Sequence, residues 1–142
     1  MLEISDSKVQ RIRKAAAYVR GATLFCLLAM FLGTHLPGIV SPSFSMGDKL
    51  LHYWAYCILA LCILASWELS KGPLQPIHFF TVWLACTIYG AFDEITQLPV
   101  GRSCDGIDWL FDIMGIITGL ALFRIARPLL YQVILRKAVV SR

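Results

Sequence analysis

The sequence predicts an all-α integral membrane protein, a four-helix bundle with both termini in the cytoplasm. Hydrophobic residues make up 58% of the 142 residues and charged residues only 15%, whereas soluble domains are roughly half apolar. The apolar residues gather in four stretches, each near the length that crosses a bilayer. Basic residues lie almost entirely in the segments that would then face one side of the membrane.

The four apolar stretches cover residues 15–36, 50–67, 77–92 and 107–126. A helix of about 20 residues spans the hydrocarbon core, so the second and third stretches are slightly short and would recruit flanking polar residues. Basic residues precede the first stretch as in a signal peptide, but no small-residue cleavage site follows it, and we expect a retained helix. The chain then divides into a polar segment 1–14, a transmembrane domain 15–126 and a basic tail 127–142.

The distribution of basic residues predicts the orientation. Five lie before the first stretch or near its start, the last of them Arg20, one lies between the second and third stretches, and five follow Phe123. Only Lys49 and Arg102 lie in the other two junctions. The positive-inside rule therefore places both termini in the cytoplasm and the first and third loops outside it. We interpret the net charge of +4 as this topology signal and as attraction to anionic lipid, not as nucleic-acid binding.

Three local features complete the expected fold. Four of the five cysteines lie within apolar stretches, without a C-x-x-C pair, and are expected to be packing residues. Residues 1–14 are expected to form a short amphipathic helix on the membrane surface. Pro128 is expected to interrupt or kink the last helix, with residues 129–135 along the cytoplasmic interface.

Most of the acidic residues lie on the predicted extracytoplasmic side. Six of the nine carboxylates occur there, at the ends of apolar stretches. They are Asp48, Asp93, Glu94, Asp105, Asp108 and Asp112. Together with Lys49 and Arg102 they give this side a formal charge of −4, which favours cations.

Helical spacing arranges these side chains into three stripes, each along one helix face. The stripes are Asp48, His52 and Tyr56; Gly90, Glu94 and Gln97, with Asp93 at the edge; and Asp108, Asp112, Gly115 and Gly119. Ionisable groups inside a membrane are costly unless they are paired or wet, so we expect one shared polar pocket. Asp108 and Asp112 would repel each other, and Arg102, Lys49, protonated His52, a cation or a raised pKa could relieve this. The two glycines are expected to form a helix-packing surface.

These motifs resemble the VanZ-like family of small bacterial membrane proteins, named for a protein associated with teicoplanin resistance. The resemblance covers about residues 32–122. Its markers are Leu36-Pro37-Gly38, Asp48-Lys49-x-x-His52-x-x-x-Tyr56, Glu94-x-x-Gln97, Arg102, and Asp108-x-x-x-Asp112-x-x-Gly115-x-x-x-Gly119. It implies a multi-pass protein of the bacterial inner membrane, with glycopeptide resistance recorded for some members. The family usually has Asn where this chain has Asp112, which adds a carboxylate to the site.

Our first functional hypothesis is a non-enzymatic envelope protein whose extracytoplasmic pocket binds a lipid head group or a lipid-linked cell-wall precursor. Arg102 and Lys49 would contact phosphate while the carboxylates hold these cations in place. The expected ligand-binding residues are Asp48, Lys49, His52, Glu94, Gln97, Arg102, Asp108 and Asp112.

A second hypothesis is a metal-assisted membrane enzyme that acts on a lipid-linked substrate. The candidate catalytic residues are His52, Glu94 and Asp108, with His52 or Glu94 as general base. Asp108, Asp112 and Glu94 are the candidate ligands of a divalent cation such as Mg²⁺, Ca²⁺ or Mn²⁺. Ion or proton transport is less favoured, because the charges stop at one face and a path through four short helices would require a homo-oligomer. The sequence leaves the choice between binding protein and enzyme open.

Overall fold

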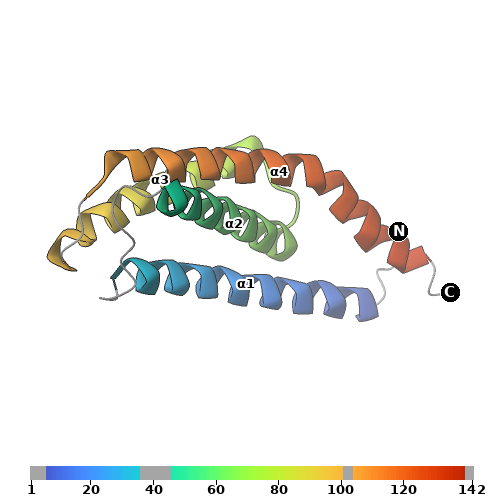
Figure 1. Ribbon diagram of the computed structural model, residues 1–142. Helices are drawn as coiled ribbons and strands as arrows, with labels where there is room; N and C mark the ends of the chain where they lie inside the picture. The colour runs from blue at the N-terminus through green and yellow to red at the C-terminus, as the bar shows by residue number, and fades with distance from the viewer. Residues whose placement is uncertain (1–5, 36–45, 101–103, 140–142) are drawn as a thin grey trace.

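The structure is a computed structural model that describes residues 6–35, 46–100 and 104–139. It contains four α-helices and one short 3₁₀ helix, and no strand occurs within these ranges. In chain order the elements are α1 (Asp6–His35), α2 (Met46–Lys71), α3 (Pro76–Thr96), η1 (Leu98–Val100) and α4 (Gly106–Val139). The predicted all-α, four-helix class is therefore confirmed (Figure 1).

Three of the helices are long and apolar enough to cross a membrane, over Val9–His35, Met46–Lys71 and Gly106–Leu129. The chain is an integral membrane protein. Helix α3 does not belong to this set although it has 21 residues, because polar side chains occupy both of its ends. A fourth span and the cytoplasmic location of the termini remain predictions.

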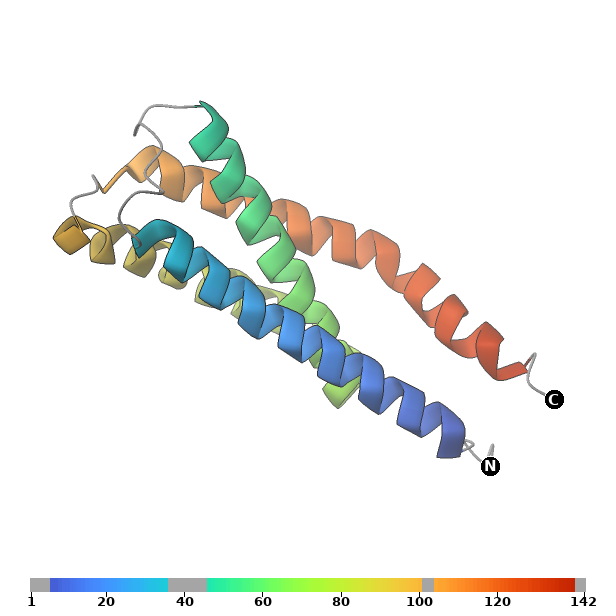
Figure 2. The same ribbon diagram turned by 60° about the horizontal axis from the view of Figure 1, so that its bottom comes forward.

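Successive helices run in alternating directions (Figure 2). Helix α2 packs mainly against α4 and α1, and α3 packs mainly against α4. The end of α1, the start of α2, the end of α3 and the start of α4 lie together at one end of the bundle, which we call the polar end. The start of α1 and the end of α4 lie at the opposite end, which we call the basic end.

A seam of two glycines brings α2 and α4 into close contact. A Cβ atom on Gly115 would lie 2.1 Å from the carbonyl oxygen of Tyr53, and one on Gly119 would lie 2.6 Å from that of Cys57. Only glycine allows the two backbones to approach this closely, so the predicted packing role of this pair is confirmed. Beside the seam, the Tyr53 hydroxyl donates to Thr118 Oγ1 at 2.9 Å.

The structure corrects one expectation about the termini and excludes one of the two alternatives for Pro128, an interrupted helix. Helix α1 is continuous from Asp6, so residues 6–14 extend the first membrane helix and do not form a separate surface helix. Helix α4 continues through Pro128 to Val139, although it bends toward its C-terminal end in Figure 1. Proline removes one backbone donor and kinks a helix. Here Arg127 and Tyr131, on either side of it, both bind Glu68 of α2 and hold the helix in place.

Two sequence motifs lie outside the described residues. Leu36-Pro37-Gly38 follows the end of α1, and Arg102 precedes α4. Helix α3 extends beyond the predicted apolar stretch 77–92 to Thr96 and carries Asp93 and Glu94 in its last turns. All five cysteines are free thiols, and Cys57 and Cys86 are buried.

Candidate functional site

The three predicted stripes meet at the polar end. Side chains from the first turns of α2 and α4 and from the last turns of α3 point into the bundle, and all but one of the carboxylates there are buried. The buried acidic residues are Asp48, Asp93, Glu94, Asp108 and Asp112. The exception is Asp105, just before α4, which is partly exposed.

Lys49 links α2 to the start of α4. Its Nζ donates to Asp108 Oδ1 at 2.7 Å and to Asp105 Oδ2 at 3.2 Å. The Ile107 backbone N–H also donates to the Asp105 carboxylate at 2.8 Å. That backbone bond, with the Lys49 ammonium, holds the pKa of Asp105 below its usual value. Lys49 is thus an internal counter-ion for two carboxylates.

His52 makes the corresponding contact one turn deeper. Its Nδ1 lies 2.9 Å from Asp112 Oδ1, and both side chains are buried. A carboxylate only accepts, so Nδ1 is the donor, and Nε2 of the neutral ring keeps its lone pair. The predicted repulsion between Asp108 and Asp112 is therefore relieved by two different partners, Lys49 and His52.

Asp112 is not fully satisfied by this contact. The residue is 1% exposed, and within the described part of the chain its Oδ2 has no hydrogen-bond partner. The same holds for the Tyr56 hydroxyl. Both atoms face Gly90 of α3, where a Cβ atom would lie 3.0 Å from Asp112 Oδ2 and 3.4 Å from the Tyr56 hydroxyl. Buried polar atoms without a partner are rare and call for an explanation.

Glu94 and Gln97 connect the end of α3 to the start of α4. Glu94 Oε2 accepts the Asp105 backbone N–H at 2.9 Å. The Gln97 amide donates to Asp93 Oδ2 at 3.1 Å and to Glu94 Oε1 at 3.4 Å. These bonds give each Glu94 oxygen one donor and hold the carboxylate between the end of α3 and the start of α4, and the roles of Glu94 as general base or metal ligand stay predictions.

Helix α1 contributes residues that the sequence analysis did not include in the site. The Thr34 hydroxyl donates to Asp93 Oδ1 at 3.1 Å, and His35 Nε2 lies 3.0 Å from Thr96 Oγ1. The sequence places Thr34 and His35 at the end of the first apolar stretch, at the depth where the acidic residues begin, but it does not give their partners. With them, all four helices meet at the polar end.

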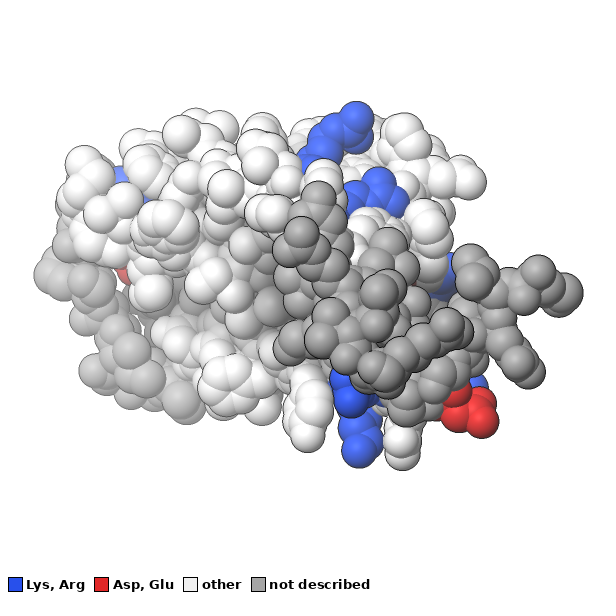
Figure 3. Space-filling view, turned by 90° about the vertical axis from the view of Figure 1, so that its right-hand side faces the viewer, with Lys and Arg blue, Asp and Glu red and all other residues white. Residues whose placement is uncertain are grey.

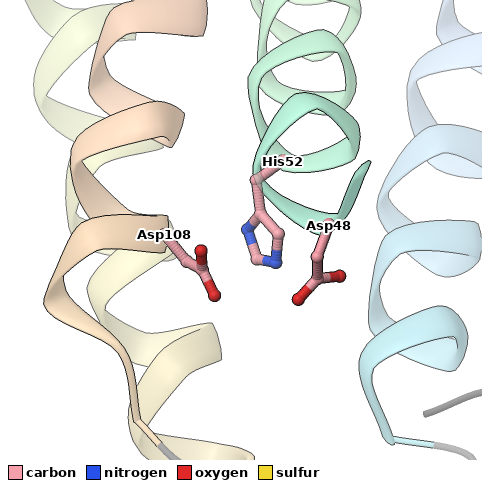
Figure 4. A group of neighbouring side chains, drawn as sticks. All are labelled: Asp48, His52 and Asp108. Carbon is pink, nitrogen blue, oxygen red and sulfur yellow. The ribbon is translucent and has the colours of Figure 1, made fainter. Parts of the chain in front are cut away.

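Two groups of side chains at the polar end could hold a metal ion. One consists of Asp48, His52 and Asp108, and the other of His52, Glu94 and Asp112, with the candidate ligand atoms of each group within 4.8 Å of one another. Figure 4 shows the first group, in which the His52 ring lies between the carboxylates of Asp48 and Asp108. A histidine whose second nitrogen is bound by a carboxylate is the usual arrangement at metal centres, and Asp112 supplies that carboxylate.

Apart from Arg102, the structure brings every predicted ligand-binding residue to one place. It defines a small membrane protein whose antiparallel helices join a carboxylate-rich polar end to a basic end. The family model for VanZ/LLP1 matches residues 2–127, so the chain belongs to the VanZ/LLP1 family and the resemblance is confirmed over a longer segment than expected. Comparisons with curated proteins and with solved structures found no match.

Proposed function

We propose that the polar end binds a divalent cation and, through it, the phosphate of a lipid head group or a lipid-linked envelope precursor. The observation that carries this proposal is His52, which is shared by two groups of candidate metal ligands. The protein would act as a binding protein of the bacterial cytoplasmic membrane, with this end facing the outside of the cell.

The balance of charge supports a cation. Six carboxylates lie within the described polar end, and the lysine and two histidines beside them are Lys49, His35 and His52. Even with both histidines charged, the negative groups outnumber the positive ones. Buried carboxylates without enough counter-ions are strongly disfavoured, and a divalent ion would lower this cost. In the group of His52, Glu94 and Asp112, an ion would also lie beside the Asp112 carboxylate, whose Oδ2 has no hydrogen-bond partner among the described residues.

The choice of ligand atoms supports a hard or borderline metal ion. Carboxylate oxygens suit Mg²⁺, Ca²⁺ and Mn²⁺, and a single imidazole favours Mn²⁺ over the first two. Asp48, His52 and Asp108 supply three ligand atoms from two helices, and Asp112 fixes the His52 ring from behind. An ion with only three protein ligands keeps positions for water or phosphate oxygen.

Phosphate would bind through the ion because the described polar end offers it little direct attraction. Lys49 is already bonded to Asp105 and Asp108, and its side chain is 11% exposed. A phosphate competing for this lysine would also have to approach the surrounding carboxylates. Direct phosphate binding by Arg102 remains a prediction, since this residue lies outside the described ranges.

Native mass spectrometry with Mn²⁺ and polyprenyl phosphate as probes tests the proposal. We expect an adduct of the detergent-purified protein that contains both probes and that is lost in Asp108→Asn. The matched control is Asp6→Asn, which removes an exposed carboxylate at the start of α1 and should leave the adduct intact. Equal binding of the lipid without a divalent ion, or equal binding by both variants, would overturn the proposal.

A metal-assisted enzyme is the second candidate, and the same His-carboxylate groups favour it. A bound divalent ion lowers the pKa of its water and can polarise a phosphate. In this case the mass of the polyprenyl phosphate would change on incubation with protein and Mn²⁺. A lipid that is recovered unchanged from the adduct would exclude turnover of this substrate.

We further propose that binding at the polar end affects glycopeptide susceptibility, as the family resemblance implies. Expression of the wild-type chain in a teicoplanin-sensitive host should raise the inhibitory concentration, and Asp108→Asn should not. If the wild-type chain and Asp108→Asn changed the inhibitory concentration equally, resistance would not depend on this site.

A further inference from the structure

We propose that a hollow between α1 and α2 at the basic end binds an anionic glycerophospholipid. This inference is independent of the function proposed for the polar end, because it rests on other residues at the opposite end of the bundle. Both the shape of the hollow and the charges around it support this ligand.

The hollow has a volume of about 360 Å³. Helix α1 contributes Arg20 and Thr23 to its lining, and the last turns of α2 contribute the rest. Ile63 and Trp67 form an apolar wall, and Ser66 and Ser70 add hydroxyl groups. None of the residues that line it is acidic. The nearest carboxylate in the sequence, Glu68, is buried and is bound by Arg127 and Tyr131 of α4.

Two cations flank the hollow. Arg20 extends from α1 to α2, where its Nη1 donates to Ser70 Oγ at 3.0 Å. This bond orients the guanidinium group and leaves its other N–H groups available for phosphate oxygens. Lys71, in the last turn of α2, adds a second positive charge. A phosphate between them would replace water contacts with charge-assisted hydrogen bonds.

The depth of the hollow favours a lipid. The membrane-spanning part of α2 ends at Lys71, so the rim of the hollow formed by Ser70 and Lys71 lies at the polar limit of that helix. Trp67 is a typical residue of the boundary between hydrocarbon and head groups, and its ring packs against His78 of α3 with 4.7 Å between ring centroids. Ile63 lies about two turns before Lys71 on α2, so the hollow has an apolar part deeper in the membrane than this cation, as a glycerol backbone and the upper part of an acyl chain require.

The wider surface of the basic end provides electrostatic attraction. Lys and Arg side chains lie at several places on this face (Figure 3). Each basic residue near an anionic membrane surface contributes to the attraction of acidic lipids. The positive-inside rule predicts that this face is cytoplasmic, where anionic head groups are abundant.

Native mass spectrometry of the full chain, purified in detergent and titrated with phosphatidylglycerol, tests the inference. Arg20→Gln and Lys71→Gln should each weaken binding roughly fivefold, the effect of removing one basic residue near a charged surface. Lys14→Gln is the matched control, because Lys14 is exposed on α1 but does not line the hollow. It should change the affinity by less than about twofold. Phosphatidylcholine should bind poorly to all four proteins.

A second variant separates the hollow from the general charge of this face. Ser66→Phe fills the hollow and keeps every charge, so it should also weaken phosphatidylglycerol binding. Free glycerol phosphate should not compete at the same concentration if the apolar wall contributes. Equal binding by Arg20→Gln and Lys14→Gln, unchanged binding by a folded Ser66→Phe, or full competition by glycerol phosphate would overturn the inference.

Discussion

The two ends of the bundle each hold an ionic network between α2 and α4, and the two networks differ in how completely the chain satisfies them. At the basic end, Glu68 accepts from Arg127 Nε at 2.8 Å, from the Tyr131 hydroxyl and from the Leu74 backbone N–H at 3.3 Å. At the polar end, His52 and Lys49 bind Asp112 and Asp108, but Asp112 Oδ2 has no partner among the described residues.

This difference suggests different roles. A buried carboxylate with a guanidinium, a hydroxyl and a backbone donor needs nothing further, and the Glu68 network is well suited to hold the end of α4 against α2. The polar end has more carboxylates than cations and would gain from an added positive charge. The comparison therefore supports a structural role for the Glu68 network, and it is the reason for proposing a cation at the polar end.

The largest expected effect on stability comes from disrupting the glycine seam, Gly115 and Gly119, which sets how α2 and α4 pack together. In Gly115→Ala the new Cβ would meet the Tyr53 carbonyl oxygen, which cannot move without displacing α2. We expect a loss of about 3 kcal/mol or more in the free energy of unfolding, measured by thermal or denaturant unfolding in detergent. Gly21→Ala, where nothing lies within 4 Å of the new Cβ, is the control and should be neutral or slightly stabilising.

Removing the counter-ion of the polar end should have the next largest effect. Lys49→Met leaves Asp105 and Asp108 without their shared ammonium and should destabilise the protein by about 2 to 3 kcal/mol without divalent ions. Because a divalent cation can replace the lost charge, Mn²⁺ should restore part of the stability. A loss that Mn²⁺ does not reduce would speak against a cation site beside Lys49.

A smaller effect is expected from Glu68→Gln at the basic end. The change weakens the bonds from Arg127 and Tyr131 but keeps the size of the side chain, and Arg127 is partly exposed. We expect a loss of about 2 kcal/mol, with the Mn²⁺-induced increase in melting temperature unchanged. If Glu68→Gln also abolished the Mn²⁺ effect, the two ends would not be independent.

The smallest effect is a change in acid sensitivity through Asp105. Its pKa is lowered by the Ile107 N–H and by Lys49, so the ionised form stabilises the fold above about pH 4, and this stability is lost as the pH falls further. Asp105→Asn should lower the free energy of unfolding by less than about 1 kcal/mol at neutral pH, since the carboxylate is partly exposed. It should also flatten the decline in melting temperature below about pH 4. If the melting temperature of Asp105→Asn fell below about pH 4 as steeply as that of the wild-type protein, this role of Asp105 would be contradicted.

The sequence predicted the polar end well because the constraint there is strong. Ionisable groups within a membrane helix bundle usually face its interior, so the spacing of Asp48 and His52, and of Asp108 and Asp112, was sufficient to predict that they lie together. The pairing of Lys49 with Asp108 and of His52 with Asp112 was not predictable. It depends on the relative rotation and depth of α2 and α4, which the glycine seam determines.

Other features could not be derived from local patterns. Thr34 and His35 belong to no motif, and their contacts depend on how α1 packs beside the end of α3. Arg127 and Tyr131 flank Pro128, and both bind Glu68 of α2. Arg127 lies 59 positions after Glu68 in the sequence, so no local pattern could predict this contact. Local rules therefore left open whether Pro128 interrupts or kinks the helix, and tertiary contacts keep the helix continuous.

The most direct test of the contrast between the two ends is the melting temperature of wild-type protein, Asp108→Asn and Glu68→Gln, each with and without Mn²⁺. An ion at about a hundred times its Kd stabilises a folded state by about 2.7 kcal/mol. We predict that Mn²⁺ raises the melting temperature of wild-type protein and of Glu68→Gln by an amount that corresponds to a stabilisation of this order. The melting temperature of Asp108→Asn should not change. An equal increase in all three proteins, or no increase in any of them, would contradict a cation site at the polar end.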